Sequence, residues 1–253
     1  MVTEPAFDRD EMTARLATLG DHLIETGSIK ITEMATRLGV SPMTIRRDLA
    51  QLEMAGIARR VRGGAVAVVG PSFAERYKVH ARAKEQIAAK LAKMLPERAA
   101  IALDSSSTIL HLVRYLDNRP LTVLTNGLET YRELSRRSLD RIILTGGELH
   151  PETGSLVGPI AEKTCKGLAV RRLFISAGGV DSSLGATERY LEEAQIKHAL
   201  AVNAAEVILA VDVSKLDAPE LAQAVAWDEI SVLVTELPPK SVPREYRDVV
   251  EVV

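Results

Sequence analysis

Hydrophobic positions near the start of the chain recur at helical spacing. Apolar residues at steps of three and four from Met12 to Leu23 predict an amphipathic helix that stops at Gly27. A shorter helix is predicted over 32–38. Gly39 follows it, and glycine suits the left-handed conformation that often ends a helix.

The next segment has the local chemistry of a third helix followed by a hairpin. Ser41 is a favourable N-cap, and Pro42 at the first helical position lacks only an N–H that would be unpaired anyway. We expect this helix to end at Gly56. Two short β-prone runs, 57–61 and 65–69, then flank a Gly-Gly pair and predict a hairpin.

From about residue 84 the pattern changes to apolar runs that alternate with amphipathic stretches. The predicted strands are 99–103, 121–125, 141–144, 172–176, 207–212 and 231–235, and the predicted helices include 109–116, 127–136 and 188–199. Alternating strands and helices are typical of an α/β domain with a mostly parallel sheet covered on both faces.

These patterns divide the chain into two domains. Residues 8–69 form a small helical domain with a hairpin, and residues 84–253 form the α/β domain. Segment 70–83 is polar and begins with Gly-Pro, so we interpret it as a linker.

Composition indicates a folded globular protein and excludes several other classes. Hydrophobic residues make up 46% and charged residues 26% of the chain, which is typical of a folded globular protein. A single cysteine, Cys165, excludes a disulfide framework and multi-cysteine metal sites, and we expect no metal or cofactor. With no signal-peptide pattern at the N-terminus and no apolar run of 18 residues, we expect a cytoplasmic protein that is not bound to a membrane.

Net charge is unevenly distributed. Residues 37–65 contain six arginines and two carboxylates, a local charge of +4, whereas the whole chain carries −2, so the remainder carries −6. A basic segment beside an acidic body favours a nucleic-acid partner for the first domain.

A helical wheel of the third helix separates a core stripe from a solvent face. Ile45, Leu49 and Leu52 form the stripe, and Met43 and Arg47 lie on the opposite side. Such a helix fits the DNA major groove, and arginines on the hairpin would contact phosphates, as in a winged helix-turn-helix. The residues predicted to contact DNA are Ser41, Met43, Thr44, Arg46, Arg47, Gln51, Arg59, Arg60 and Arg62.

Taken alone, an arginine pair on a helix is more often only a solvated face. Here the cap, the glycine turn, the wheel and the basic hairpin agree with one another, and this agreement favours DNA binding.

In the α/β domain, polar residues follow several predicted strands. A run of one aspartate and four hydroxyl residues at 104–108 ends the first strand, and a helix comes next. Helix N-termini and hydroxyls of this kind bind anions, and ligands of parallel sheets lie at the carboxyl ends of strands. The predicted effector-binding residues are Asp104, Ser105, Ser106, Ser107, Thr108, Thr125, Asn126, Gly147, Gly179, Asp181 and Lys215.

Simpler interpretations remain for each of these residues. A Ser/Thr run before a helix is often only a cap, Asp212 and Lys215 could be a surface pair, and Gly146-Gly147 could be a plain turn. His111 near Ser107 carries little weight as a catalytic pair, because no third orienting group is visible. The nucleotide-binding patterns GxGxxG and GxxxxGK[ST] are absent from the sequence.

The first domain resembles the N-terminal domain of the DeoR family of bacterial transcriptional regulators over roughly residues 8–68. The resemblance rests on Leu38-Gly39-Val40-Ser41, Thr44-Ile45-Arg46-Arg47-Asp48-Leu49 and Gly63-Gly64-Ala65.

The resemblance extends over roughly 75–236, where the family has an effector domain similar in fold to sugar-phosphate isomerases. It implies matching motifs at 104–108, Thr125-Asn126, Gly146-Gly147, 179–181 with Gly185, and 212–215. Ser106 stands where the family usually has glycine. A serine would distort this loop if the position required a positive φ.

The resulting hypothesis is a transcriptional regulator, most simply a repressor of a carbohydrate operon, released from operator DNA by a phosphorylated or otherwise anionic sugar. One winged domain buries little DNA, so we expect a homodimer or higher homo-oligomer. The alternative is a sugar-phosphate isomerase or deaminase with a DNA-binding appendage. Asp181 is its best candidate base, but the residues after it lack further acids, so we expect no enzymatic activity.

Overall fold

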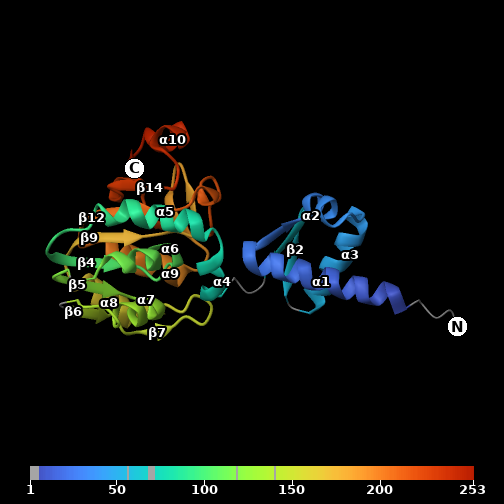
Figure 1. Cartoon of the computed structure of the whole chain (residues 1–253), viewed down its shortest axis with the longest axis horizontal. Helices are drawn as coiled ribbons and strands as arrows, with labels where there is room; N and C mark the ends of the chain where they lie inside the picture. The colour runs from blue at the N-terminus through green and yellow to red at the C-terminus, as the bar shows by residue number, and fades with distance from the viewer. Residues whose placement is uncertain (1–5, 56, 68–71, 118, 140) are drawn as a thin grey trace. The chain divides into compact units, whose positions relative to one another are not determined.

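The computed structural model describes residues 6–55, 57–67, 72–117, 119–139 and 141–253. They form two compact units, Met1–Val79 and His80–Val253, each with its own core (Figure 1). Within these described residues, no helix combines the length and the apolar character needed to cross a bilayer.

The first unit has three main helices and a three-stranded sheet, which confirms the predicted winged helix-turn-helix architecture. Its elements are α1 (Ala6–Thr26), β1 (Ser28–Lys30), α2 (Ile31–Leu38), α3 (Pro42–Met54), β2 (Ala58–Val61) and β3 (Gly64–Ala67). β2 and β3 form the predicted antiparallel hairpin. β1 pairs with the other side of β3 and was not predicted, because three residues are too short for a strand pattern. The predicted helix end at Gly56 and strand end at 68–69 lie outside the described residues.

Local capping chemistry fixes the start of α3 as predicted. The Ser41 hydroxyl accepts a hydrogen bond from Thr44 N at 3.1 Å, and Pro42 occupies the first helical position. Gly39 ends α2 with a φ of +66°, the left-handed conformation expected there.

The segment predicted as a linker is largely helical. α4 (Phe73–Lys78) is held by a capping box in which Ser72 and Glu75 bond each other's backbone N–H, and α5 (Ala81–Ala92) begins three residues later. Residues 73–78 and 81–83 of this segment are therefore helical, and its role as a linker stays a prediction. A Ser-x-x-Glu capping signal was present in the sequence and outweighs the initial Gly-Pro.

A seven-stranded parallel sheet forms the centre of the second unit, in the order β15-β14-β12-β9-β4-β5-β6. Its strands are β4 (Ala99–Leu103), β5 (Leu121–Thr125), β6 (Arg141–Leu144), β9 (Val170–Ile175), β12 (Ala204–Ala210), β14 (Val232–Val234) and β15 (Glu251–Val252). Six of these were predicted, and β9 and β12 begin and end slightly earlier than expected. β15 is a two-residue edge strand that the sequence pattern did not reveal.

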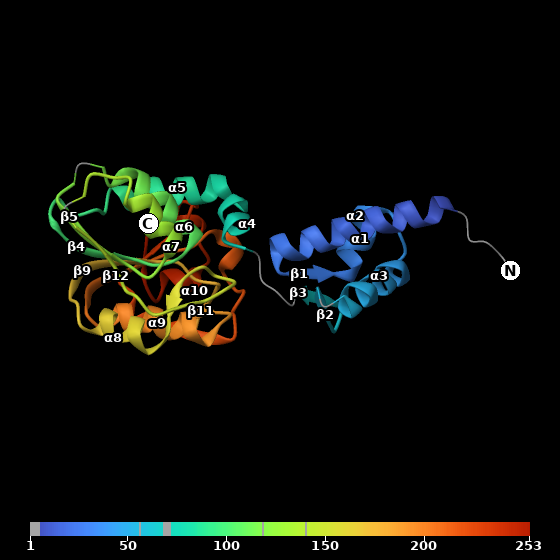
Figure 2. The same ribbon diagram turned by 90° about the horizontal axis from the view of Figure 1, so that it is seen from below.

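Helices cover both faces of this sheet, as predicted for an α/β domain. Figure 2 shows α5, α6 (Ser107–Leu110) and α7 (Leu128–Leu134) on one face, with α8 (Gly158–Lys166) and α9 (Leu191–Ala201) on the other. Two separate hydrophobic clusters fill the spaces beneath these layers. The predicted helix 109–116 is short in α form, because it becomes a 3-10 helix (His111–Tyr115) after α6.

The second unit also contains smaller elements that were not predicted. They are β7 (Glu148–Leu149), β8 (Leu156–Val157), β10 (Gly179–Asp181), β11 (Gly185–Glu188), β13 (Ala222–Val225), α10 (Arg244–Arg247) and the 3-10 turns Val213–Lys215, Trp227–Glu229 and Pro239–Ser241. β10, β11 and β13 form an antiparallel sheet, and β7 pairs with β8. Strands this short depend on tertiary pairing rather than on local pattern.

Candidate functional site

The α3 helix has the polarity that the sequence predicts. Ile45, Leu49 and Leu52 are buried in the core of the first unit, whereas Met43 is 62% exposed and Arg47 is also exposed. The face that a DNA groove would meet is therefore free of core contacts.

A buried ion pair fixes α3 against α1. The Arg15 guanidinium donates to both carboxylate oxygens of Asp48, at 2.5 and 3.2 Å, and Asp48 is almost fully buried. Sequence reasoning missed this pair, although Asp48 lies beside Leu49 and near the core stripe on the wheel. The bidentate geometry sets the orientation at which α3 presents its outer face.

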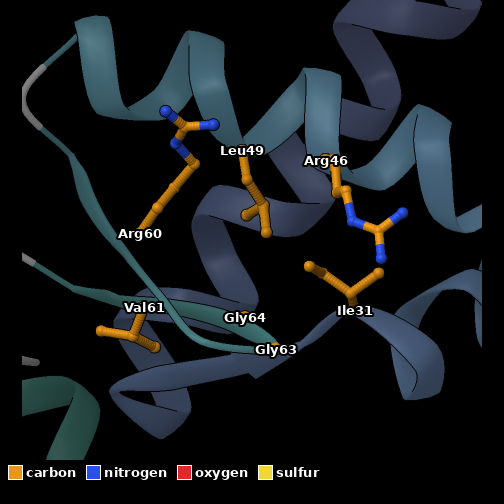
Figure 3. Close-up of a pocket in the computed structure, with 7 residues that line it drawn as sticks. All are labelled: Ile31, Arg46, Leu49, Arg60, Val61, Gly63 and Gly64. Atoms are coloured by element: carbon orange, nitrogen blue, oxygen red, sulfur yellow. The ribbon is translucent and has the colours of Figure 1, made fainter.

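Between α3 and the hairpin lies a groove of about 190 Å³, with arginines on its sides (Figure 3). It is lined by Ile31, Arg46, Leu49, Arg60, Val61, Gly63 and Gly64. The Arg60 side chain and backbone N–H both donate to the Glu53 carboxylate, at 2.5 and 3.0 Å, and these bonds lower the pKa of Glu53. Part of the Arg60 charge is thus compensated, while Arg46 is exposed at the other side.

The remaining predicted DNA contacts differ in how freely they face solvent. Arg59 and Arg62 are exposed on the hairpin, and Ser41 is exposed at the start of α3 with its hydroxyl 2.9 Å from that of Thr44. The Gln51 amide instead donates to the Met12 sulfur at 3.8 Å, toward α1. Gln51 is therefore half-buried, with its amide directed at α1.

In the second unit, the predicted effector loop lies where the strand order of the sheet reverses, between β4 and β9. The helix after β4 covers one face and the helix after β9, its neighbour, covers the other. Such a switch point opens a crevice at the carboxyl ends of parallel strands. Asp104 follows β4 at this point and is fully buried. Its carboxylate accepts hydrogen bonds from the backbone N–H groups of Ser106 and Ser176, both at 2.9 Å.

A buried lysine from α9 occupies the centre of this region. Lys197 Nζ lies 2.9 Å from Asp104 Oδ2 and 2.7 Å from Glu188 Oε1, and it donates to the Ser176 carbonyl at 2.6 Å. Burial by itself would lower the pKa of Lys197, but Asp104, Glu188 and Glu193 outweigh it and raise that pKa. Burial raises the pKa of Glu188, against the opposing effect of Lys197. Lys197 therefore carries a fixed positive charge inside the fold.

The serine loop is buried and connected to two further charged residues. Ser105 Oγ donates to Glu193 at 3.4 Å, and Lys84 of α5 donates to Ser107 Oγ at 3.1 Å. Ser105, Ser107 and Thr108 are all buried, as are Lys84 and Glu193. These contacts add the ammonium group of Lys84 and the carboxylate of Glu193 to the hydroxyls of the loop.

Ser106 fits this loop without backbone strain. Its φ is −76°, and its hydroxyl both accepts from Ile109 N at 3.1 Å and donates to Asp104 Oδ1 at 2.5 Å. The position does not require a positive φ, so the condition under which serine would distort the loop is not met. Ser106 acts as the N-cap of α6 and helps to orient Asp104.

The end of β5 brings a second pair of predicted residues to the loop. Thr125 and Asn126 are fully buried, and a side chain at Gly127 would lie 2.8 Å from the Ser105 Cα. Asn126 Nδ2 donates to the Leu156 carbonyl at 3.3 Å, which orients the amide. Among the described residues, Asn126 Oδ1 has no hydrogen-bond donor.

For two other predicted effector residues, contacts within the fold explain why an aspartate and a glycine stand at these positions. The Asp181 carboxylate accepts from the Ser183 and Leu184 N–H groups, at 2.8 and 3.0 Å, in the β10–β11 turn. Gly147 has a φ of +113°, and a Cβ there would lie 2.5 Å from the Val157 carbonyl.

Gly179 and Lys215 lie together beyond the end of the sheet. A Cβ at Gly179 would meet the Ala218 carbonyl at 1.7 Å, and Leu216 bridges to Val180 of β10. Lys215 is half-buried in this segment. Within the described ranges, no hydrogen bond or ion pair joins Asp181, Gly147, Gly179 or Lys215 to the serine loop.

Comparison with known proteins places both units in one family. The family model "DeoR-like helix-turn-helix domain" matches residues 15–69, and "DeoR C terminal sensor domain" matches residues 79–237. The chain belongs to the DeoR family. It is therefore a transcriptional regulator with a helix-turn-helix domain and a sensor domain.

Relatives within the DeoR family span nearly the whole chain. The lactose phosphotransferase system repressor of Streptococcus mutans is 30% identical over 88% of this chain and 91% of its own. The L-fucose operon activator of Escherichia coli is 31% identical over 88% of this chain and 94% of its own. Among solved structures, ribose 5-phosphate isomerase A from Neisseria gonorrhoeae is similar over 53% of this chain and 52% of that one, with a TM-score of 0.37 and 16% identity.

In this DeoR-family chain, the charged residues missed by sequence reasoning lie on the buried faces of helices. Lys84 shares a face with Ile87 and Leu91 of α5, and Glu193 and Lys197 share one with buried residues of α9. The signal that could have found them is a charged residue at an otherwise apolar helical position, since an unpaired charge is rarely buried.

Proposed function

We propose that this DeoR-family protein regulates a carbohydrate operon and that a phosphorylated sugar, bound at the carboxyl ends of β4, β5 and β9, controls its affinity for operator DNA. The printed names of its relatives, a lactose phosphotransferase system repressor and an L-fucose operon activator, support a sugar-related role. Because one of them is a repressor and the other an activator, the direction of control is part of the proposal. Repression relieved by the sugar is the simplest form.

The observation that carries the effector site is the Asn126 side chain. Its Oδ1 is buried and lacks a donor among the described residues, while its Nδ2 is already bonded. An unsatisfied buried acceptor costs roughly 1–3 kcal/mol. A sugar hydroxyl that donates to Oδ1 would remove this cost, and hydroxyl donors are what distinguish a sugar from most other small anions.

The charges nearby suit a ligand with both hydroxyls and an anionic group. The Glu193 carboxylate can accept from hydroxyls, whereas Lys84 and the serine hydroxyls of the loop suit phosphate oxygens. α6 has only four residues, so Lys84, rather than a helix terminus, supplies the main counter-charge in this proposal. Lys215, predicted from sequence, would contribute from the segment after β12.

The position of Lys84 also connects the ligand to the rest of the chain. Lys84 lies in the first turn of α5, four residues after His80, where the second unit begins. His80 has a φ of +52°, which is uncommon for a non-glycine residue. A phosphate that moved Lys84 would move this turn and hence the chain that leads to the DNA-binding unit. Control of DNA binding requires that the two arrangements differ in ligand affinity.

Assembly into at least a homodimer is part of the proposal. A single winged unit buries too little DNA for tight specific binding, and two-fold operators usually match two-fold proteins.

We propose ligand binding rather than catalysis for the second unit. Isomerisation needs a base that is free to take a proton from carbon. Lys197 is held by two carboxylates and a carbonyl, and Glu193 accepts from both Ser105 and Ser155. Incubation with pentose and hexose phosphates tests this directly, and turnover above background would favour the isomerase alternative.

The effector site is tested by a melting-temperature screen of the full chain against hexose and pentose phosphates. Unphosphorylated sugars and inorganic phosphate serve as controls. The proposal predicts a rise with at least one sugar phosphate, because ligands of the native state stabilise it. It also predicts that Asn126→Ala loses this rise. A screen without any stabilising sugar phosphate, or an unchanged rise in Asn126→Ala, would contradict the site.

A further inference from the structure

The outer face of α3 offers few side chains that are free to read base edges. Glu53 is tied to Arg60, and the Gln51 amide is turned toward Met12. Arg46 lies at the groove beside the hairpin (Figure 3). On the side opposite the core stripe, this leaves two long side chains in the first half of the helix.

Those two side chains are Met43 and Arg47. Met43 is the second residue of α3 and is 62% exposed, and within the described part of the chain no hydrogen bond or ion pair holds the Arg47 guanidinium. Residues four apart share a helix face, with Cβ atoms about 5–6 Å from each other. The exposed face of α3 therefore presents one apolar and one cationic group side by side.

These two groups match different features of the major groove. Arginine donates in bidentate fashion to guanine O6 and N7, and an apolar side chain contacts the C5 methyl of thymine. Methionine is unbranched and adapts to irregular apolar surfaces. An exposed methionine needs no explanation by itself, but this one occupies the N-terminal turn of a recognition helix, the part that reaches base edges.

We infer that Met43 is a specificity-determining residue that reads the methyl group of a thymine in the operator. The inference rests on the proposed function. A rise of about 1.5 Å per residue separates Met43 from Arg47 by about 6 Å along the helix, close to two base pairs. The thymine read by Met43 lies one or two base pairs from the guanine read by Arg47.

The chain supplies a matched control in Met54. It is also an exposed methionine of α3, on the same side of the wheel, but it lies at the opposite end of the helix and is 90% exposed. At about 16 Å from Met43 along the axis, it is too far from the N-terminal turn to reach the same base.

The test starts from a duplex selected by the full-length protein from a random pool. Each thymine is then replaced by deoxyuridine, which removes only the methyl group. For the wild-type protein and for Met54→Ala, we expect one replacement per half-site to weaken binding roughly threefold to tenfold. For Met43→Ala, the same replacement should change nothing.

The possible results separate this inference from the proposed function. If no duplex is enriched, both fail. If a specific duplex binds but no deoxyuridine replacement weakens it, or if Met43→Ala remains as sensitive as the wild type, only the role of Met43 is overturned. Met43→Leu, which keeps an apolar contact, should retain part of the sensitivity, and the melting temperatures of all variants verify that they fold.

Discussion

Lys197 Nζ lies 2.9 Å from Asp104 Oδ2, and this buried pair joins α9 to the end of β4. Both side chains are almost fully excluded from solvent, and Glu188 shares the same ammonium group. The position of the serine loop therefore depends on an ion pair as well as on packing.

Replacement of Lys197 should destabilise the folded protein. Lys197→Met leaves Asp104 and Glu188 buried without their cation, so the free energy of unfolding should fall by roughly 3–5 kcal/mol. Urea unfolding of the variant measures this loss. Lys215→Ala, at a half-buried lysine outside the cluster, should change it by less than about 1 kcal/mol. Similar losses in both variants would show that the Lys197 cluster has no special role.

Replacement of Arg47 should weaken operator binding without affecting the fold. Arg47 is exposed opposite the core stripe, so Arg47→Ala should cost about 1–3 kcal/mol in binding free energy and relax specificity at one base pair. Fluorescence anisotropy with the selected duplex measures the change. Arg98→Ala, an exposed arginine of the second unit, is the control. Equal affinity of the wild type and Arg47→Ala would remove Arg47 from the interface.

Sequence reasoning succeeded where structure is determined by neighbours in the chain. Ser41, Pro42 and Gly39 set the ends of α2 and α3 through local capping, and the stripe from Ile45 to Leu52 follows helical spacing. The same locality located the serine loop, since a strand followed by hydroxyls and a helix is a pattern of consecutive residues.

What could not be predicted depends on partners that are distant in sequence. Lys84, Glu193 and Lys197 meet the loop from 23, 88 and 93 residues away, and no local pattern shows which carboxylate a lysine will find. Asp181 and Gly147 were chosen by motif, yet the turn and close contact that they occupy are visible only in three dimensions.

Experiment can show which of two lysines, Lys84 or Lys215, contributes more to binding of the sugar phosphate. Lys84 donates to Ser107 and is buried, whereas Lys215 is more exposed and its charge is better screened. With a stabilising sugar phosphate, Lys84→Met should lose nearly all of the rise in melting temperature, and Lys215→Ala only part of it. The reverse order would place the phosphate at the end of β12 instead. Lys84→Arg, which keeps the charge, should retain some of the rise.

Cys165 should be unreactive in the folded protein. Burial raises the pKa of its thiol to about 12, so almost none of it is thiolate at pH 8. Labelling by a disulfide reagent at pH 8 should therefore be at least about a hundredfold slower than for a free cysteine, and should accelerate on unfolding in urea. Rapid labelling of the native protein would show that α8 opens readily.

A ligand of the second unit should control DNA binding by the first. This control is tested by the affinity of the full-length protein for its selected duplex, measured by anisotropy with and without the sugar phosphate that raises the melting temperature most. The ligand should weaken binding at least tenfold in the wild type, and not in Lys84→Met, whereas inorganic phosphate should have no effect. An unchanged affinity at saturating ligand would contradict it.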